Sequence, residues 1–172
     1  MILLFSGGYD STILAIQHLD KIDILLHIGY DHPAKEQEQT ASLRIYQHLK
    51  KRKPTLQYKK IYIPIDAKEM NIGSGQTGAR YVPNRNAIFL SVASNYAYGQ
   101  ECKTIMYGAS SLDQKDYPDC RPEFIQRISE ILKIRIIAPL LTESYTIQDE
   151  ILDRSWSCYE PIEGKPCGLC NS

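Results

Sequence analysis

The N-terminal segment limits the fold of this chain more than any other. An apolar run, Ile2–Phe5, breaks into Ser6, Gly7 and Gly8, and an apolar helical pattern begins near Ser11. A strand that turns through glycines into a helix forms a concave nest of backbone N–H groups, which suits an anion and above all a phosphate. The glycines also let the backbone approach such a ligand closely. A plain strand–turn–helix corner is the alternative interpretation.

The polar residues after the glycines favour the phosphate interpretation. Asp10, Ser11 and Thr12 follow directly, and no lysine stands where the P-loop pattern G-x-x-x-x-G-K-[ST] needs one. The segment instead resembles the SGGxDS loop of ATP pyrophosphatases, enzymes that cleave ATP between its α and β phosphates. The resemblance implies that ATP binds there with Mg²⁺, and that Asp10 is a metal or hydroxyl partner. The implied nucleotide ligands are Ser6, Gly7, Gly8, Asp10, Ser11 and Thr12.

Apolar runs of strand length alternate with helical patterns along the rest of the chain. This alternation, with strands rich in Ile and Leu, predicts an α/β fold with a doubly wound parallel sheet. Ligands bind such sheets at the carboxyl ends of the strands, where the glycine loop is expected. The expected strands are Ile2–Phe5, Ile22–Ile28, Tyr58–Ile63, Thr104–Tyr107 and Ile134–Pro139. The expected helices are Ser11–Leu19, Ala34–Lys51, Asn84–Tyr98, Pro122–Leu132 and Ile147–Arg154, and the glycine-rich Asn71–Gly78 is expected to be a loop.

Composition excludes several classes of protein. The 20 basic and 20 acidic residues cancel, so a general electrostatic grip on nucleic acid is not expected. No apolar run approaches the roughly 20 residues of a membrane span, and a core strand at the N-terminus is not a signal peptide. We therefore expect a cytoplasmic protein that acts on small molecules. In that compartment the five cysteines are expected to be metal ligands or free thiols rather than disulfides.

A first polar motif, Tyr81–Asn86, precedes an expected helix. Asn84 can cap this helix, and Arg85 lies in its first turn. A cation in that position opposes the helix dipole, so an anion is expected to compensate Arg85. Arginine pairs well with a carboxylate or a phosphate, which makes Arg85 a candidate anion clamp. A surface arginine beside a capping asparagine is the alternative.

A second polar motif, Asp116–Phe124, lies between a strand and a helix. Two prolines frame an acid, Asp119, a thiol, Cys120, and a cation, Arg121. A helix start with a buried cysteine is the alternative, but the segment holds more polar and conformationally special residues than a helix start requires.

The C-terminal segment 155–172 is dense in Cys, Gly and Pro. Cys158, Cys167 and Cys170 resemble part of a structural zinc knuckle, which needs four ligands in a tetrahedral array. We expect the fourth ligand beyond Ser172. A redox C-x-x-C is the rival interpretation, although its usual thioredoxin-like context is not evident. The sequence therefore predicts an α/β domain over residues 1–154 and a zinc-binding knob over residues 155–172.

Together these motifs resemble the QueC family of 7-cyano-7-deazaguanine synthases. The family pattern contains SGGxDST, Y-V-P-x-R-N, Y-P-D-C-R-P-E-F and a terminal W-S-C-Y followed by C-G-x-C. The resemblance covers the whole chain in order, and the Y-P-D-C-R-P-E-F segment is far more specific than the loop. The matching segments are Ser6–Thr12, Tyr81–Asn86, Tyr117–Phe124, Trp156–Tyr159 and Cys167–Cys170.

The resemblance implies an ATP-dependent carbon–nitrogen ligase. It would convert 7-carboxy-7-deazaguanine and ammonia into 7-cyano-7-deazaguanine through acyl-adenylate and amide intermediates. It also implies a homodimer and a queuosine-pathway role. The implied catalytic residues are Asp10, Ser11, Arg85, Asp119 and Arg121, and the implied substrate-binding residues are Tyr81, Arg85, Asp119 and Arg121.

The chain departs from the family pattern at several places. The family stretch Phe-Asp-Tyr-Gly-Gln-Arg-His corresponds to 28–34, where only Tyr30 is kept and His32 stands nearby. A family lysine has no counterpart in 140–146, Ser110 replaces an asparagine, and the fourth cysteine is missing. A compact, diverged member, such as one carried by a virus and working in host cytoplasm, would fit these changes.

Three other functions remain as alternatives. The first is a relative that stops at 7-amido-7-deazaguanine for nucleic-acid modification. The second is tRNA thiolation, which would need a catalytic cysteine pair and an RNA-binding surface. The third is a catalytically dead nucleotide-binding or zinc interaction module, which the intact glycine loop disfavours.

Overall fold

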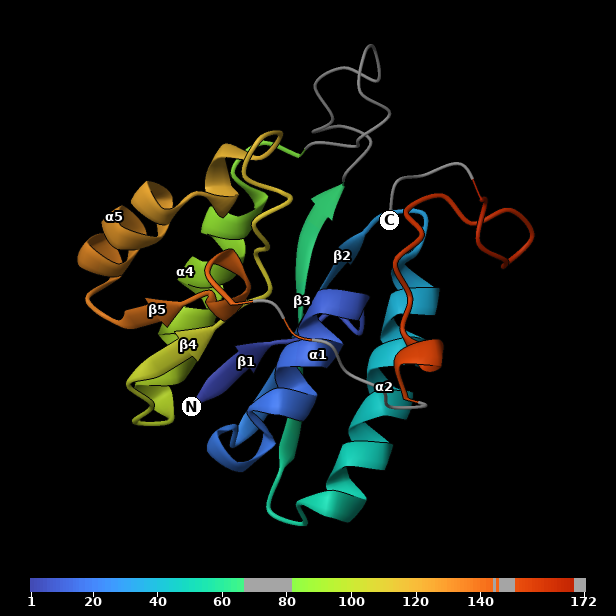
Figure 1. Ribbon diagram of the computed structural model, residues 1–172, viewed down its shortest axis with the longest axis horizontal. Coiled ribbons are helices and arrows are strands. Elements are labelled where there is room, and N and C mark those ends of the chain that lie inside the picture. Colours follow the sequence, from blue (N-terminus) through green and yellow to red (C-terminus); the bar gives the residue numbers. More distant parts are fainter. Residues whose placement is uncertain (67–81, 144, 146–150, 169–172) are drawn as a thin grey trace.

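The centre of the fold is a five-stranded sheet in which every pair of neighbours is parallel. The computed structural model describes residues 1–66, 82–143, 145 and 151–168. The sheet order is β3-β2-β1-β4-β5, so the chain moves outward from β1 in one direction and then returns to build the other half (Figure 1). The strands are β1 Ile2–Leu4, β2 Ile24–Asp31, β3 Gln57–Asp66, β4 Thr104–Met106 and β5 Arg135–Ile137.

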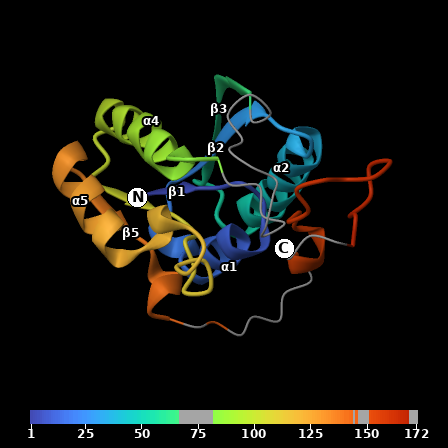
Figure 2. The same ribbon diagram turned by 90° about the horizontal axis from the view of Figure 1, so that it is seen from above.

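Helices cover both faces of this sheet. Figure 2 shows α1 and α2 on one side and α4 and α5 on the other. Each face has its own cluster of buried apolar residues, so both sides of the strands are shielded from water. The predicted doubly wound parallel sheet is therefore confirmed. The helices are α1 Tyr9–Gln17, α2 Lys35–Arg52, α4 Arg85–Gly99 and α5 Pro122–Leu132, with short 3-10 turns η1 Leu19–Lys21, η2 Pro118–Cys120, η3 Pro139–Leu141 and η4 Leu152–Arg154.

Element boundaries follow local sequence signals where these are strong. Helix α5 has the predicted bounds, because Pro122 fixes the backbone at its first position and Lys133 ends it in a left-handed conformation with φ of 51°. Strand β2 begins at Ile24 rather than Ile22, because Ile22 closes the turn η1. The other described elements begin and end within a few residues of their predicted positions.

Several predictions fall partly or wholly outside the described residues. Asn71–Gly78 and Tyr81 lie there, as does the first half of the predicted helix Ile147–Arg154, whose described end forms the 3-10 turn η4 rather than an α-helix. The boundary between residues 154 and 155 stays a prediction. Within the described ranges, no helix is both long and apolar enough to cross a membrane.

Candidate active site

The glycine loop lies at the carboxyl end of β1, where the order of the sheet reverses. Gly7 has a φ of +86°, and a Cβ on it would lie 2.5 Å from the backbone N of Ser42 in α2. Only glycine fits this position. Gly8 is the N-cap of α1, and a Cβ there would lie 3.2 Å from Ser6 Oγ. The loop is thus pressed against α2, while the first N–H groups of α1 have no partners within the helix.

Hydroxyl groups hold this loop in shape. Ser11 Oγ and Thr12 Oγ1 donate to the Gly8 carbonyl at 3.0 and 2.8 Å. Ser6 Oγ accepts the Gly8 N–H at 3.1 Å and lies 3.2 Å from Ser11 Oγ. Thr12 is fully buried and Ser6 is exposed. In this arrangement the buried hydroxyls shape the nest, and direct phosphate contacts by them stay a prediction.

Two carboxylates lie beside the nest. Burial, and then the nearby Asp113 carboxylate, raise the pKa of Asp10 to about 6. Asp113 is held by Ser110, whose N–H and Oγ donate to Asp113 Oδ2 at 3.2 and 2.8 Å. Gly108 brings this segment close to α1, since a Cβ there would lie 3.3 Å from the Ser11 N. Hard carboxylate oxygens next to a phosphate nest fit Mg²⁺, which would relieve the repulsion between the acids.

A partly buried arginine lies at the start of α4. Arg85 Nη1 donates to Tyr30 Oη at 3.1 Å. The Tyr30 ring stacks on His32 with centroids 4.4 Å apart and meets Phe89 edge-on at 5.5 Å. Burial alone would lower the pKa of Arg85, but the phenol groups of Tyr30 and Tyr159 and the Glu38 carboxylate outweigh it, so the pKa rises and the guanidinium stays charged.

Glu38 in α2 is a carboxylate whose charge interacts with this arginine. Burial raises the pKa of Glu38 to about 7, and Arg85 acts in the opposite direction. Glu38 Oε2 lies 3.5 Å from His32 Nε2. Burial, and then Arg85, lower the pKa of His32 to about 4, so its imidazole is neutral at pH 7. Glu38 is thus an acid from a distant helix whose charge interacts with that of Arg85, and a direct ion pair between the two stays a prediction.

Asp119 lies at the same end of α4. Only 6% of it is exposed, and its Oδ2 accepts the backbone N–H of Asn86 at 3.3 Å. The carboxylate thereby caps the helix that begins with Arg85. Its Oδ1 is buried, and no residue that the structure describes bonds to it. A buried acceptor of this kind indicates that a ligand or water supplies the missing donor.

Cys120 next to Asp119 is a neutral thiol at physiological pH. Burial, and then Asp119, raise the pKa of Cys120 to about 12. Asn86 Nδ2 approaches its Sγ at 3.7 Å. Because the thiolate is the nucleophile, this cysteine is poorly suited to sulfur transfer.

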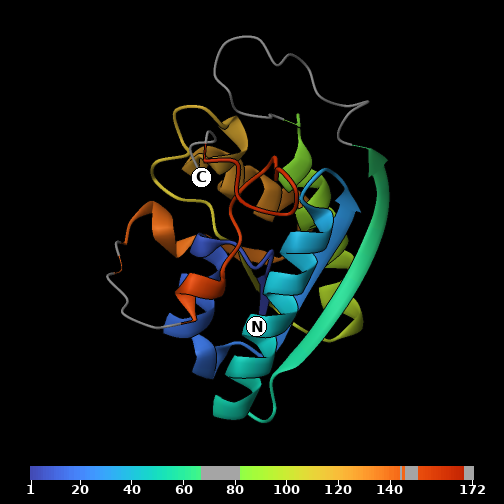
Figure 3. The ribbon, with the colours of Figure 1, turned by 90° about the vertical axis from the view of Figure 1, so that its right-hand side faces the viewer.

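The C-terminal segment returns to the loop. Figures 1 and 3 show it beside α1 and α2, and its η4 turn contacts both helices. The Trp156 N–H donates to the Gly7 carbonyl at 2.9 Å. Further along, Tyr159 lies near Arg85, which lowers the pKa of this phenol, although burial is the larger effect and the pKa rises to about 12. One segment thus runs from the glycine loop to the Arg85 cluster, by which we mean Tyr30, His32, Glu38, Arg85 and Asp119.

Comparison with known proteins assigns the chain to a family. A family model described as Queuosine biosynthesis protein QueC matches residues 1–172. The chain belongs to the QueC family. It is 33% identical over 202 residues to the 7-cyano-7-deazaguanine synthase of Campylobacter jejuni, covering 98% of this chain and 88% of that protein. It is 29% identical over 203 residues to the synthase of Buchnera aphidicola, covering 100% and 86%. The resemblance drawn from the motifs is confirmed.

Two solved structures share the fold at low sequence identity. One is described as a predicted subunit of tRNA methyltransferase from Methanocaldococcus jannaschii, with a TM-score of 0.59 and 16% identity over 84% of this chain and 69% of that one. The other is the U34-tRNA thiolase NcsA from Methanococcus maripaludis, with a TM-score of 0.54 and 13% identity over 88% and 53%. They support the α/β fold alone.

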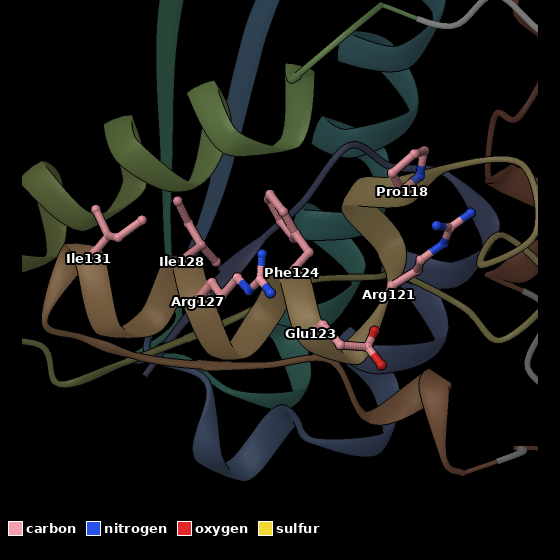
Figure 4. A pocket seen from close by; sticks show the side chains of 7 residues that line it. All are labelled: Pro118, Arg121, Glu123, Phe124, Arg127, Ile128 and Ile131. Carbon is pink, nitrogen blue, oxygen red and sulfur yellow. The ribbon is translucent and has the colours of Figure 1, made fainter.

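Among the QueC motifs, the structure places Arg121 apart from the Arg85 cluster. The Arg121 guanidinium donates to the carbonyls of Gln114 and Lys115 at 2.9 and 3.4 Å. It lines a pocket along α5 (Figure 4), together with Pro118, Glu123, Phe124, Arg127, Ile128 and Ile131. Its catalytic and substrate-binding roles stay predictions, as does the substrate role of Tyr81, which lies outside the described residues.

The family's cysteine motif is only partly described. Cys158 is 5% exposed, and its Sγ accepts the Cys167 N–H at 3.2 Å. Cys170 lies outside the described residues, and the described ones contain no cluster of three groups suited to a metal. The zinc knob is therefore not shown.

Sequence reasoning missed three residues that the structure brings to this candidate site. Glu38, Asp113 and Tyr159 join it only through the fold. The expected anion opposite Arg85 was the signal for Glu38, but nothing local indicated which acid would supply it. Trp156–Tyr159 matched a family motif, which marked the segment without giving it a role.

Proposed function

We propose that this protein is an ATP-dependent synthase that converts 7-carboxy-7-deazaguanine and ammonia into 7-cyano-7-deazaguanine. The observation that carries the proposal is the pairing of a phosphate nest with the partly buried Arg85 cluster at one edge of the sheet, in a chain of the QueC family. The names of its curated relatives support the same activity.

The glycine loop would hold the pyrophosphate end of ATP. Backbone N–H groups at the start of α1 point to the position where an anion would lie, and the exposed Ser6 hydroxyl adds a donor. Asp10, with Asp113 nearby, would hold Mg²⁺, which supplies positive charge against the phosphates. The proposed nucleotide-binding residues remain Ser6, Gly7, Gly8, Asp10, Ser11 and Thr12.

The Arg85 cluster would hold the deazapurine. The planar guanidinium can pair with the substrate carboxylate or with the adenylate phosphate. Tyr30 offers an aromatic ring beside that cation, and Asp119 Oδ1 offers a buried acceptor for an N–H of the guanine-like edge. Because the carboxyl ends of β1 and β2 are neighbours, the two ligands would meet at this edge.

The reaction requires positioning more than chemistry from the protein. The substrate carboxylate attacks the α phosphorus of ATP, and pyrophosphate leaves. Ammonia then attacks the acyl carbon, and AMP leaves with the amide formed. The amide oxygen attacks a second ATP in the same way, and loss of AMP and a proton gives the nitrile. The role of Arg85 would be to hold the adenylate phosphate, which carries negative charge in both activation steps.

The product distinguishes this proposal from the amide-forming alternative. Carboxy substrate, ATP and ammonium are incubated with the protein, and the products are separated and weighed by mass spectrometry. We expect the nitrile, lighter than the amide by one water. An amide that persists with excess ATP would replace the proposal by the alternative, and no change in substrate would contradict both.

We also propose that Cys158, Cys167 and Cys170 bind zinc. The N–H of Cys167 donates to Cys158 Sγ, a bond that favours a thiolate, and Gly168 has the positive φ of 69° that suits a tight C-x-x-C turn. Metal analysis of freshly purified protein is expected to find zinc, and its loss in Cys158→Ala. Protein without zinc would contradict the assignment. The homodimer implied by the family stays a prediction.

A further inference from the structure

The C-terminal strap, residues 155–159, runs directly along the glycine loop. The Trp156 N–H donates to the Gly7 carbonyl at 2.9 Å. A Cβ on Gly8 would lie only 3.4 Å from the Trp156 carbonyl oxygen, so the two backbones are in contact. The strap therefore borders the nest at which the phosphates would bind.

Ser157 on this strap meets the start of α1. Its Oγ accepts the N–H of Tyr9, the first residue of the helix, at 3.4 Å. That N–H is one of the donors that a helix N-terminus leaves without an intrahelical partner. A serine hydroxyl can also donate, and the Ser157 hydroxyl hydrogen has no acceptor within the described ranges. Ser157 thus takes up one backbone donor of the nest and presents its own donor beside it.

The neighbours of Ser157 are fixed on both sides. Trp156 is bonded to the loop, and its indole Nε1 donates to the Cys158 carbonyl at 2.7 Å. Cys158 is buried and accepts the N–H of Cys167. The position of the Ser157 hydroxyl is therefore fixed by the hydrogen bonds of Trp156 and Cys158, its neighbours in the chain.

We propose that the Ser157 hydroxyl donates a hydrogen bond to the phosphates of ATP, so that the C-terminal strap is part of the nucleotide site. The proposal rests on the proposed function for ATP as the ligand of the loop. The C-terminal segment that contains Cys158 and Cys167 would then do more than stabilise the fold. It would place the Ser157 hydroxyl at the glycine loop near the N-terminus.

The test compares Ser157→Ala with Ser155→Ala, which removes a hydroxyl from the same strap. The Ser155 hydroxyl has no hydrogen-bond partner among residues that the structure describes. Hydrogen bonds to charged groups are strong, so Ser157→Ala should weaken binding of magnesium pyrophosphate and raise the KM for ATP about tenfold. We expect kcat to change less than about twofold, because the lost bond serves binding. Ser155→Ala should match the wild type.

The melting temperature without ligand separates binding from folding. We expect it to be unchanged in Ser157→Ala, while the rise that magnesium pyrophosphate causes becomes smaller. Unchanged pyrophosphate binding would overturn the proposal. So would a parallel loss of ligand-free stability and binding, since the serine would then only shape the loop. If the wild type binds pyrophosphate but leaves the carboxy-deazaguanine unchanged, the proposed function fails while the Ser157 test still stands.

Discussion

Replacing Asp10 with asparagine is expected to abolish turnover while making the ligand-free protein more stable at pH 7. Asparagine keeps the size of the side chain but loses the charge that would hold Mg²⁺ beside the phosphates. Removing a metal ligand of a phosphate site should lower the rate about a thousandfold. The stability gain arises because the wild-type carboxylate is partly buried and close to Asp113.

The pH dependence follows from the raised pKa of Asp10. Its pKa is about 6 in the folded protein and about 4 in an unfolded chain, so between these values the folded state binds more protons. Stability from this group is therefore present below pH 4 and is lost as the pH rises through 6. The full shift corresponds to about 3 kcal/mol, which partial exposure reduces to about 1–2 kcal/mol.

Urea unfolding at pH 4 and at pH 7.5 measures this effect. Asp10→Asn should raise the free energy of unfolding at pH 7.5 and change it little at pH 4. Asp153→Asn, at an exposed acid in η4, is the matched control and should have no effect at either pH. An asparagine variant that is less stable at pH 7.5, or that still releases pyrophosphate at the wild-type rate, would contradict the assignment.

Replacing Arg85 with methionine should lower the rate about a thousandfold and also destabilise the protein. The rate falls because no other cation joins Tyr30 and Asp119 at the start of α4 among the described residues. Stability falls because the partly buried Glu38 loses the nearby positive charge of Arg85, which favours its ionised form, and this loss is expected to cost about 1 kcal/mol. Removing both partners is far less costly, so Arg85→Met with Glu38→Gln should recover most of the stability and none of the activity.

Kinetics and urea unfolding of the single and double variants test this prediction. Arg127→Met removes an exposed arginine from α5 and serves as the control, with activity and stability expected to match the wild type. A single variant with more than a tenth of the wild-type rate would remove Arg85 from the site. A double variant as unstable as the single one would mean that Glu38 does not compensate this arginine.

The fold was predictable because its signals are local. Two glycines between an apolar strand and a helix define the nest, and Pro122 with Glu123 defines the start of α5. The need for an anion opposite Arg85 also followed from its place in a first helical turn. Its identity did not follow, because Glu38 lies in α2, far from Arg85 in sequence, and only the fold brings the two charges near each other.

Other parts of the site depend on packing that no local pattern encodes. Asp119 was expected to face a substrate. The structure shows that its Oδ2 accepts the backbone N–H of Asn86 at the start of α4, a contact between segments far apart in sequence. Arg121 lies in the most specific motif, yet its guanidinium donates to the backbone carbonyls of Gln114 and Lys115. This orientation depends on the turn η2 that precedes Arg121, which the motif alone does not reveal. Ser157 reaches α1 only because the chain folds back over its own beginning.

The central claim is that one site activates two oxygen atoms in turn, each by transfer of an adenylyl group. Counting AMP, pyrophosphate and nitrile in one incubation tests this claim most directly. We expect two AMP and two pyrophosphate for each nitrile, and no ADP. Release of ADP and phosphate, or a single AMP for each nitrile, would contradict it.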